Sequence, residues 1–248
     1  MCVVTERQRL ARRHGFQGFT DGTCLPNKLI ELGIGAAEVG CLDVLGWLWD
    51  MEGKPMMSSN MFKSNIDAVA RAAVFHGRLD VLEWLVEKKN YNVAKSSIMD
   101  SAARGGNMAT VQRLRNLGAK FNKCSFVLGA AAAGGHAALL DWLIAEGAII
   151  SHTLIVHAMA RNGHLEMLAA HVAKVNAGDF DGPETDGYAL VSTKKVLEFA
   201  ASAGKLHVIE WLQTLPHPFP LKTSNALASA TEGCHAHVVS WLHDRGCS

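Results

Sequence analysis

The sequence has few of the features that mark highly charged or β-rich proteins. Its 24 Lys and Arg residues nearly balance its 23 Asp and Glu residues. The net charge of +1 gives no electrostatic reason to expect a nucleic acid or an acidic membrane surface as partner. Only 6 prolines and 2 tyrosines occur in 248 residues, and Ala and Leu are abundant, which favours helices.

Signals for export, disulfide bonding and membrane insertion are also missing. The 6 cysteines show no paired spacing and no C-x-x-C motif, which favours free thiols in a reduced, intracellular protein. Four arginines between residues 7 and 13 interrupt the stretch where a secretory signal would need an apolar core. The most apolar stretch, residues 126–150, carries His136, Asp141 and Glu146, so we expect no membrane span.

Motifs for catalysis are missing as well. The sequence contains no G-x-S-x-G and no H-E-x-x-H motif, so we expect neither enzymatic activity nor a cofactor. One alternative is a metal-binding or catalytic protein that uses the Cys234/His237 region, where soft ligands are close in sequence. We expect no metal there, because one helix would point these residues in different directions. The candidate ligands are Cys234, His235, His237, His243 and Cys247.

The sequence does contain a repeated phrase, clearest in residues 135–143 (GHAALLDWL). Of the 6 tryptophans, five stand seven residues after the first residue of such a phrase: Trp47, Trp84, Trp142, Trp211 and Trp241. A recurrence of this kind is the signature of a repeat architecture. We call the first residue of each phrase its anchor, and the anchors are Gly40, Gly77, Gly106, Gly135, Gly163, Gly204 and Cys234.

Each repeat predicts two helices joined by a tight turn at the anchor. A pair of mostly small residues, such as Ala131 and Ala132, precedes each anchor by about four positions, and apolar residues follow at the fourth, fifth and eighth places. Further glycines, Gly118, Gly147 and Gly246, are placed to end three of the second helices. We expect the alanines to allow close approach of neighbouring helix pairs, and Leu, Val and Trp to fill the space between them.

This pattern resembles the ankyrin repeat. Residues 154–165 (LIVHAMARNGHL) carry the family's early histidine at His157, its small residues and its Gly-His pair, and residues 131–148 carry Ala-Ala, Gly-His and Gly-Ala. The family's Thr-Pro pair is missing. Four of the six anchor intervals are 28 to 30 residues, from the differences between the residue numbers, and are shorter than the family's period. The chain is most similar to divergent ankyrin proteins of large DNA viruses and some protists.

The resemblance implies an all-α, ankyrin-like solenoid of about seven helix-turn-helix repeats with shortened hairpin loops. We expect residues 1–26 to form an N-terminal extension or cap and residues 27–248 to form the array. Two longer anchor intervals predict insertions near 52–60 and 177–193. The turn histidines His136, His164 and His235 are expected to bond the backbone of a neighbouring repeat, as in the family.

The function implied is a protein–protein interaction module or adaptor that binds a protein partner on its concave face. By resemblance to the family's variable positions, the partner would contact the residues just before the anchors, of which we select Phe75, His76, Arg104, Arg161, Asn162 and Glu232. Residues 25–32 (LPNKLIEL) faintly resemble an F-box opening, so a substrate-recruiting adaptor of a ubiquitin ligase is an alternative. We expect a monomer in the cytoplasm, with the nucleus as an alternative, or in the host cell cytoplasm if the source is viral.

Overall fold

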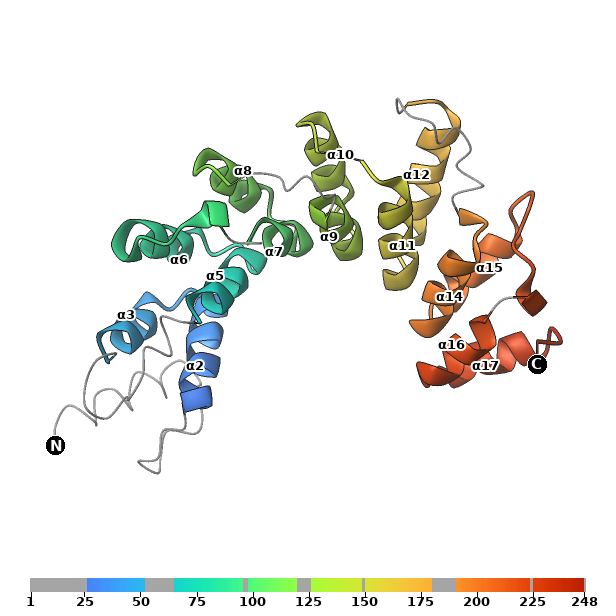
Figure 1. Cartoon of the computed structure of the whole chain (residues 1–248), viewed down its shortest axis with the longest axis horizontal. Coiled ribbons are helices and arrows are strands. Elements are labelled where there is room, and N and C mark those ends of the chain that lie inside the picture. Colours follow the sequence, from blue (N-terminus) through green and yellow to red (C-terminus); the bar gives the residue numbers. More distant parts are fainter. Residues whose placement is uncertain are drawn as a thin grey trace. The chain divides into compact units, whose positions relative to one another are not determined.

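The computed structural model describes residues 26–51, 65–95, 98–119, 126–148, 150–179, 191–223 and 225–247. They belong to two compact units, residues 1–120 and 121–248. The described residues contain fourteen α-helices and no strand, which confirms the predicted all-α class (Figure 1). The predicted extension 1–26 and the insertions 52–60 and 177–193 lie largely outside the described residues.

The helices form pairs, in which a first helix ends at the anchor turn and a second helix packs against it. The first unit holds α2 (Pro26–Val39) with α3 (Leu42–Met51), α5 (Ile66–Phe75) with α6 (Leu79–Glu83), and α7 (Ile98–Gly105) with α8 (Met108–Asn116). Helix α6 continues into a π-helix, η1 (Trp84–Lys88), and a short 3₁₀ turn, η2 (Val93–Lys95), follows.

The second unit contains four such pairs (Figure 1). They are α9 (Phe126–Gly134) with α10 (Ala137–Ala145), α11 (His152–Asn162) with α12 (Leu165–Asn176), α14 (Lys194–Ser202) with α15 (Leu206–Gln213), and α16 (Ala226–Glu232) with α17 (Ala236–His243). A 3₁₀ turn, η3 (Leu221–Thr223), precedes α16.

The anchors make the turns because they adopt the left-handed conformation. All seven have positive φ, for example +78° at Gly135. The N–H of Gly135 donates to the carbonyl of Ala132 at 3.2 Å, and the N–H of His136 donates to the carbonyl of Ala131 at 3.1 Å. These two bonds close a helix with a left-handed residue just after its end. The geometry explains why the small pair precedes the anchor by three and four residues.

Cys234 is the one anchor that is not glycine, and its φ is +58°. A side chain with a Cβ is strained in this conformation by roughly 1–2 kcal/mol. We therefore expect Cys234→Gly to raise the free energy of unfolding by about 0.5–1 kcal/mol, because the strain exceeds the entropy that glycine adds to the unfolded chain. Urea denaturation followed by circular dichroism measures this change. Cys234→Ala is the control and should change stability little, since it keeps the Cβ.

The core follows the predicted apolar positions. In the α9–α10 pair, Ala131 and Ala132 are fully buried, and Leu139, Leu140 and Leu143 are at most 3% exposed. Successive first helices pack directly on one another within each unit, α2 on α5 and α5 on α7, then α9 on α11, α11 on α14 and α14 on α16. Because alanine has the smallest side chain that still favours a helix, it permits these close helix contacts.

The repeated tryptophans do not fill the core as expected. All five are only half-buried. At 100° per residue, Trp142 lies about 107° from the centre of the buried stripe formed by Leu139, Leu140 and Leu143, which places its ring on the flank of α10. The aliphatic residues therefore form the interior. Two of the tryptophans contact the preceding second helix, where Trp84 meets Trp49 of α3 and the Nε1–H of Trp241 donates to Glu210 of α15 at 3.1 Å.

Within each unit, polar side chains connect some of the pairs to the one before them. One residue after the anchor, Arg78 donates to the carbonyl of Glu38 at 2.7 Å. His164 and His235 at the same position donate to the carbonyls of Ala133 and Ser202 at 3.0 and 3.1 Å, as expected for two of the turn histidines. Three residues after the anchor, histidines bond the preceding anchor's carbonyl, His207 that of Gly163 and His237 that of Gly204, both at 3.0 Å.

Candidate functional site

The residues selected as partner contacts lie at the C-terminal ends of the first helices. Five of them belong to the last turns of α5, α7, α11 and α16, and His76 directly follows α5. All six are exposed. The helical rotation explains this, because the two residues before an anchor lie about 110–150° around the helix from the centre of the buried small pair.

In the first unit, the structure brings Phe75 and Arg104 to adjacent helix ends. A Cβ added at Gly105, the neighbour of Arg104, would overlap the backbone carbonyl of Phe75. The Phe75 side chain is 40% exposed and makes an edge-to-face contact with the ring of His76, 5.0 Å between centroids. Val39, at the end of α2, is 55% exposed. The ends of α2, α5 and α7 therefore present apolar and cationic side chains together.

In the second unit, the selected residues are separated. Arg161 and Asn162 end α11, and the Asn162 side chain donates to the carbonyl of Ala158 at 2.8 Å. Glu232 ends α16, and α14 packs against both helices, so that Ser202 and its neighbours lie between the selected residues. Arg161 belongs to a different unit from Phe75 and Arg104, and a common surface for these three residues stays a prediction.

A second aromatic contact on the first helices joins α11 to α14. The rings of His157 and Phe199 meet edge to face, 4.9 Å between centroids. Burial lowers the pKa of His157, and the nearby Lys195 ammonium lowers it further. His157 is therefore neutral at pH 7 and offers one donor and one acceptor nitrogen. The sequence marked His157 only as a family position.

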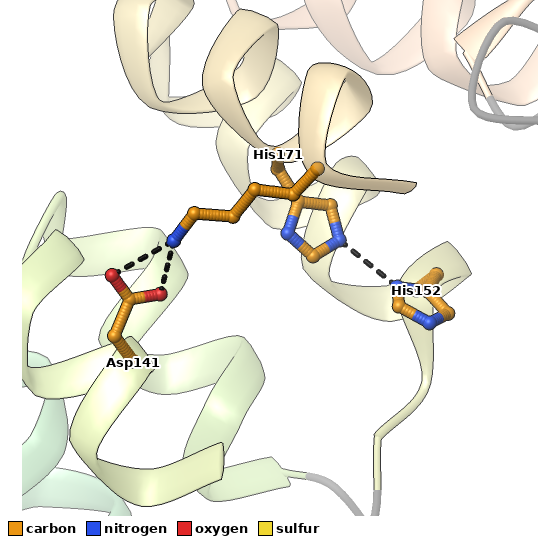
Figure 2. A network of polar contacts seen from close by, with 4 residues as sticks. Asp141, His152 and His171 are labelled. Atoms are coloured by element: carbon orange, nitrogen blue, oxygen red, sulfur yellow. Dashed lines mark hydrogen bonds and ion pairs between the residues drawn. The ribbon is translucent and has the colours of Figure 1, made fainter. Parts of the chain in front are cut away.

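Two buried histidines contact each other in the second unit. His152 begins α11 and His171 lies in α12, and they are 8% and 4% exposed. Nδ1 of His152 and Nε2 of His171 are 3.0 Å apart, so one nitrogen donates its proton and the other accepts (Figure 2). The same helix carries Lys174, whose Nζ lies 2.7 Å from a carboxylate oxygen of Asp141 in α10.

Burial, helped by the neighbouring His152 and Lys174 and opposed by Asp141, lowers the pKa of His171 to about 4. His171 is therefore uncharged at pH 7. It occupies the eighth place after its anchor, where the other six repeats carry leucine. Sequence reasoning missed this pair, although a histidine at a leucine position of the aligned repeats was the signal that could have found it.

Two of the five candidate ligands of the alternative metal site bond the backbone instead. His235 and His237 donate to backbone carbonyls, Cys234 is exposed and Cys247 is buried. No group of three or more side chains suited to hold a metal ion occurs in the described ranges. In the stretch that resembles an F-box opening, Leu29 and Leu32 are 3% and 5% exposed because they belong to the packed face of α2.

Among the residues that the structure describes, no helix has the length and apolar character to cross a membrane. Comparison of the sequence with models of known protein families and with curated proteins found no match. The candidate surface is thus defined by its own geometry, as the exposed ends of the first helices.

Proposed function

We propose that the chain is an ankyrin-like repeat protein that binds a protein partner through its first helices and has no catalytic activity. Three features support the repeat assignment: left-handed anchors, buried small pairs at a constant distance from them, and polar side chains that bond the preceding pair's backbone. Together they fit a stack in which each pair packs only on its neighbours. We further propose a monomer without a nucleic-acid or membrane partner.

The observation that carries the binding proposal is the location of the exposed apolar side chains. The four large hydrophobic residues exposed within the described ranges all lie on first helices: Val39 at 55%, Phe75 at 40%, Phe126 at 58% and Leu154 at 42%. Exposed apolar surface is costly in water unless another molecule covers it. Val39 and Phe75 end α2 and α5, where the candidate surface lies, whereas Phe126 and Leu154 lie in the first turns of α9 and α11. The exposed pair at the C-terminal ends favours a binding surface there.

The charges suggest which side chains the partner supplies. Arg104 and Arg161 are exposed at the ends of α7 and α11, and Phe75 is exposed at the end of α5. Aromatic and arginine side chains contribute most of the energy of many protein interfaces. A partner segment carrying acidic and apolar side chains would complement this set.

We expect the triple variant Phe75→Ala, Arg104→Ala, Arg161→Ala to lose the partner that the wild-type chain recovers from its native cell. The affinity for that purified partner, measured by calorimetry, should fall at least about a hundredfold, since three side chains that contribute strongly to the proposed interface are removed. Circular dichroism and the melting temperature should stay unchanged, because all three side chains are exposed.

A matched control changes three exposed residues on second-helix elements of the same pairs, Glu87→Ala, Gln112→Ala and Glu166→Ala. This control should bind as the wild type does. Equal affinity of the wild type and the first triple variant would refute the proposed surface. Loss of binding by the control alone would move the site to the second helices.

A further inference from the structure

The sixth tryptophan, Trp49, does not follow the repeat. It lies in α3 two residues beyond the repeat position, which Trp47 occupies. Its ring meets that of Trp84, in the next pair, edge to face, with centroids 6.1 Å apart and an interplanar angle of 84°. Two rings at nearly a right angle form two walls of an aromatic corner. Both tryptophans are half-buried, so the corner is reachable from solvent.

A cation fills this corner. Nζ of Lys89 lies 4.5 Å from the ring centroid of Trp49 and 4.8 Å from that of Trp84. Both distances fall within the range where an ammonium group is attracted by the negative face of an aromatic ring. One lysine held between two tryptophans is the arrangement by which aromatic cages bind ammonium ligands.

The backbone builds this arrangement through an unusual turn. In an α-helix, Lys89 would be rotated by about 140° from Trp84, on the other side of the helix. The π-helix η1 covers residues 84–88, and its wider turn of about 4.4 residues reduces that rotation to about 50°. Asn90 then ends the segment with a φ of +53°. π turns are rare and occur frequently at functional sites.

We propose that Trp49 and Trp84 form a binding site for a methylated ammonium group, which Lys89 occupies as an internal substitute. A methylated ammonium is held more firmly than lysine in such a corner, because its methyl groups contact the rings and it loses less hydration on leaving water. The source of the group is a trimethylated lysine of a protein or a free molecule such as choline. The site lies on second-helix elements, so it is independent of the first-helix surface.

The test uses the full chain and its Lys89→Ala variant, with calorimetric titration of a short peptide carrying one trimethyl-lysine. We expect saturable binding to Lys89→Ala with a Kd of about 1 mM or tighter, and binding at least about tenfold weaker to the wild type, where Lys89 competes. Lys88→Ala, a change of the exposed neighbour, should bind as weakly as the wild type.

Two ligand controls establish the chemistry. A peptide with the neutral tert-butyl isostere should not bind, because it lacks the charge that the rings attract. Choline tests the source: tighter binding of the peptide assigns the group to a protein, tighter binding of choline assigns it to a free molecule, and either supports the site.

A folded Lys89→Ala variant that binds neither ligand overturns the proposal and leaves Lys89 as a clamp between α3 and η1. Equal binding of the neutral isostere overturns it too. A further variant combines Lys89→Ala with Trp49→Phe and should bind the peptide more weakly than Lys89→Ala alone. Phenylalanine is used instead of alanine because it keeps an aromatic ring, so the chain is expected to remain folded.

Discussion

Gly105→Ala is expected to lower the free energy of unfolding of the first unit by about 3 kcal/mol, although it replaces a helical glycine with the best helix former. The Cβ added at this position would overlap the backbone O, C and Cα atoms of Phe75. Backbone atoms at a helix end cannot rotate away as a side chain does, so α7 must move from α5 or bend. Urea denaturation followed by circular dichroism measures the loss.

Gly46→Ala is the matched control in the same unit. Gly46 lies inside α3, and a Cβ there would meet no atom within 4 Å. We expect this substitution to raise stability by about 0.5–1 kcal/mol, the usual difference in helix propensity. If the two substitutions change the free energy of unfolding in opposite directions, the close contact between α5 and α7 is the reason why position 105 requires glycine. A neutral or stabilising effect of Gly105→Ala would show that α5 and α7 are not in close contact there.

The second unit is expected to lose about 3 kcal/mol of stability between pH 7 and pH 4 through His171 alone. Its pKa is about 4 in the folded chain and about 6.5 in the unfolded chain, so the unfolded state takes up the proton first as the pH falls. The stabilising effect is complete above pH 6.5 and is lost as the pH falls toward 4. The two pKa values differ by about 2.5, and each pKa unit corresponds to about 1.4 kcal/mol, which accounts for the size of the expected loss of stability.

The double variant His152→Leu, His171→Leu separates this effect from other titrations. Leucine has about the size of histidine, and replacing both partners of a buried hydrogen bond with apolar groups is nearly neutral at pH 7. Between pH 7 and pH 4, the free energy of unfolding of the double variant should therefore fall by about 3 kcal/mol less than that of the wild type. Parallel loss in both proteins would mean that the buried pair does not control the acid response.

The turn, the helix pairs and the core stripe could be predicted because they repeat. A left-handed turn needs glycine, and close packing of first helices needs alanine, so both recur at fixed distances from the anchor. The exception at Cys234 was recognised as an anchor because the surrounding residues kept the pattern. The repeated sequence pattern thus reflects two backbone constraints, the left-handed turn and the close packing of first helices, which apply to every pair.

Recurrence does not show how deeply a repeated side chain is buried, and it does not predict contacts that occur only once. The tryptophans were expected in the interior because they recur, although their helix position places them on the flank. His152 and His171 lie 19 residues apart, and no local pattern joins them. The contact of Lys89 with Trp84 depends on a π turn, which the helical spacing of the sequence does not indicate.

The exposure of the selected residues could be predicted from the sequence, whereas their role in binding stays a prediction. The exposed positions before the anchors follow from helical rotation, and they are exposed in the structure. Which of these residues act together depends on the arrangement of the two units, which the sequence does not specify. Val39 was omitted from the selection, although it occupies the same kind of position as Phe75 and is more exposed, 55% against 40%.

The side-chain bonds from the anchor turns to the preceding pair run in one direction. The donor side chain belongs to the later pair and the accepting carbonyl to the earlier one, as for Arg78 with Glu38 and His207 with Gly163. In these bonded pairs, the accepting carbonyls are therefore made on the ribosome before the side chains that donate to them. During synthesis, a newly made pair is completed when its successor emerges, so the chain can fold stepwise from its N-terminal side without waiting for distant segments.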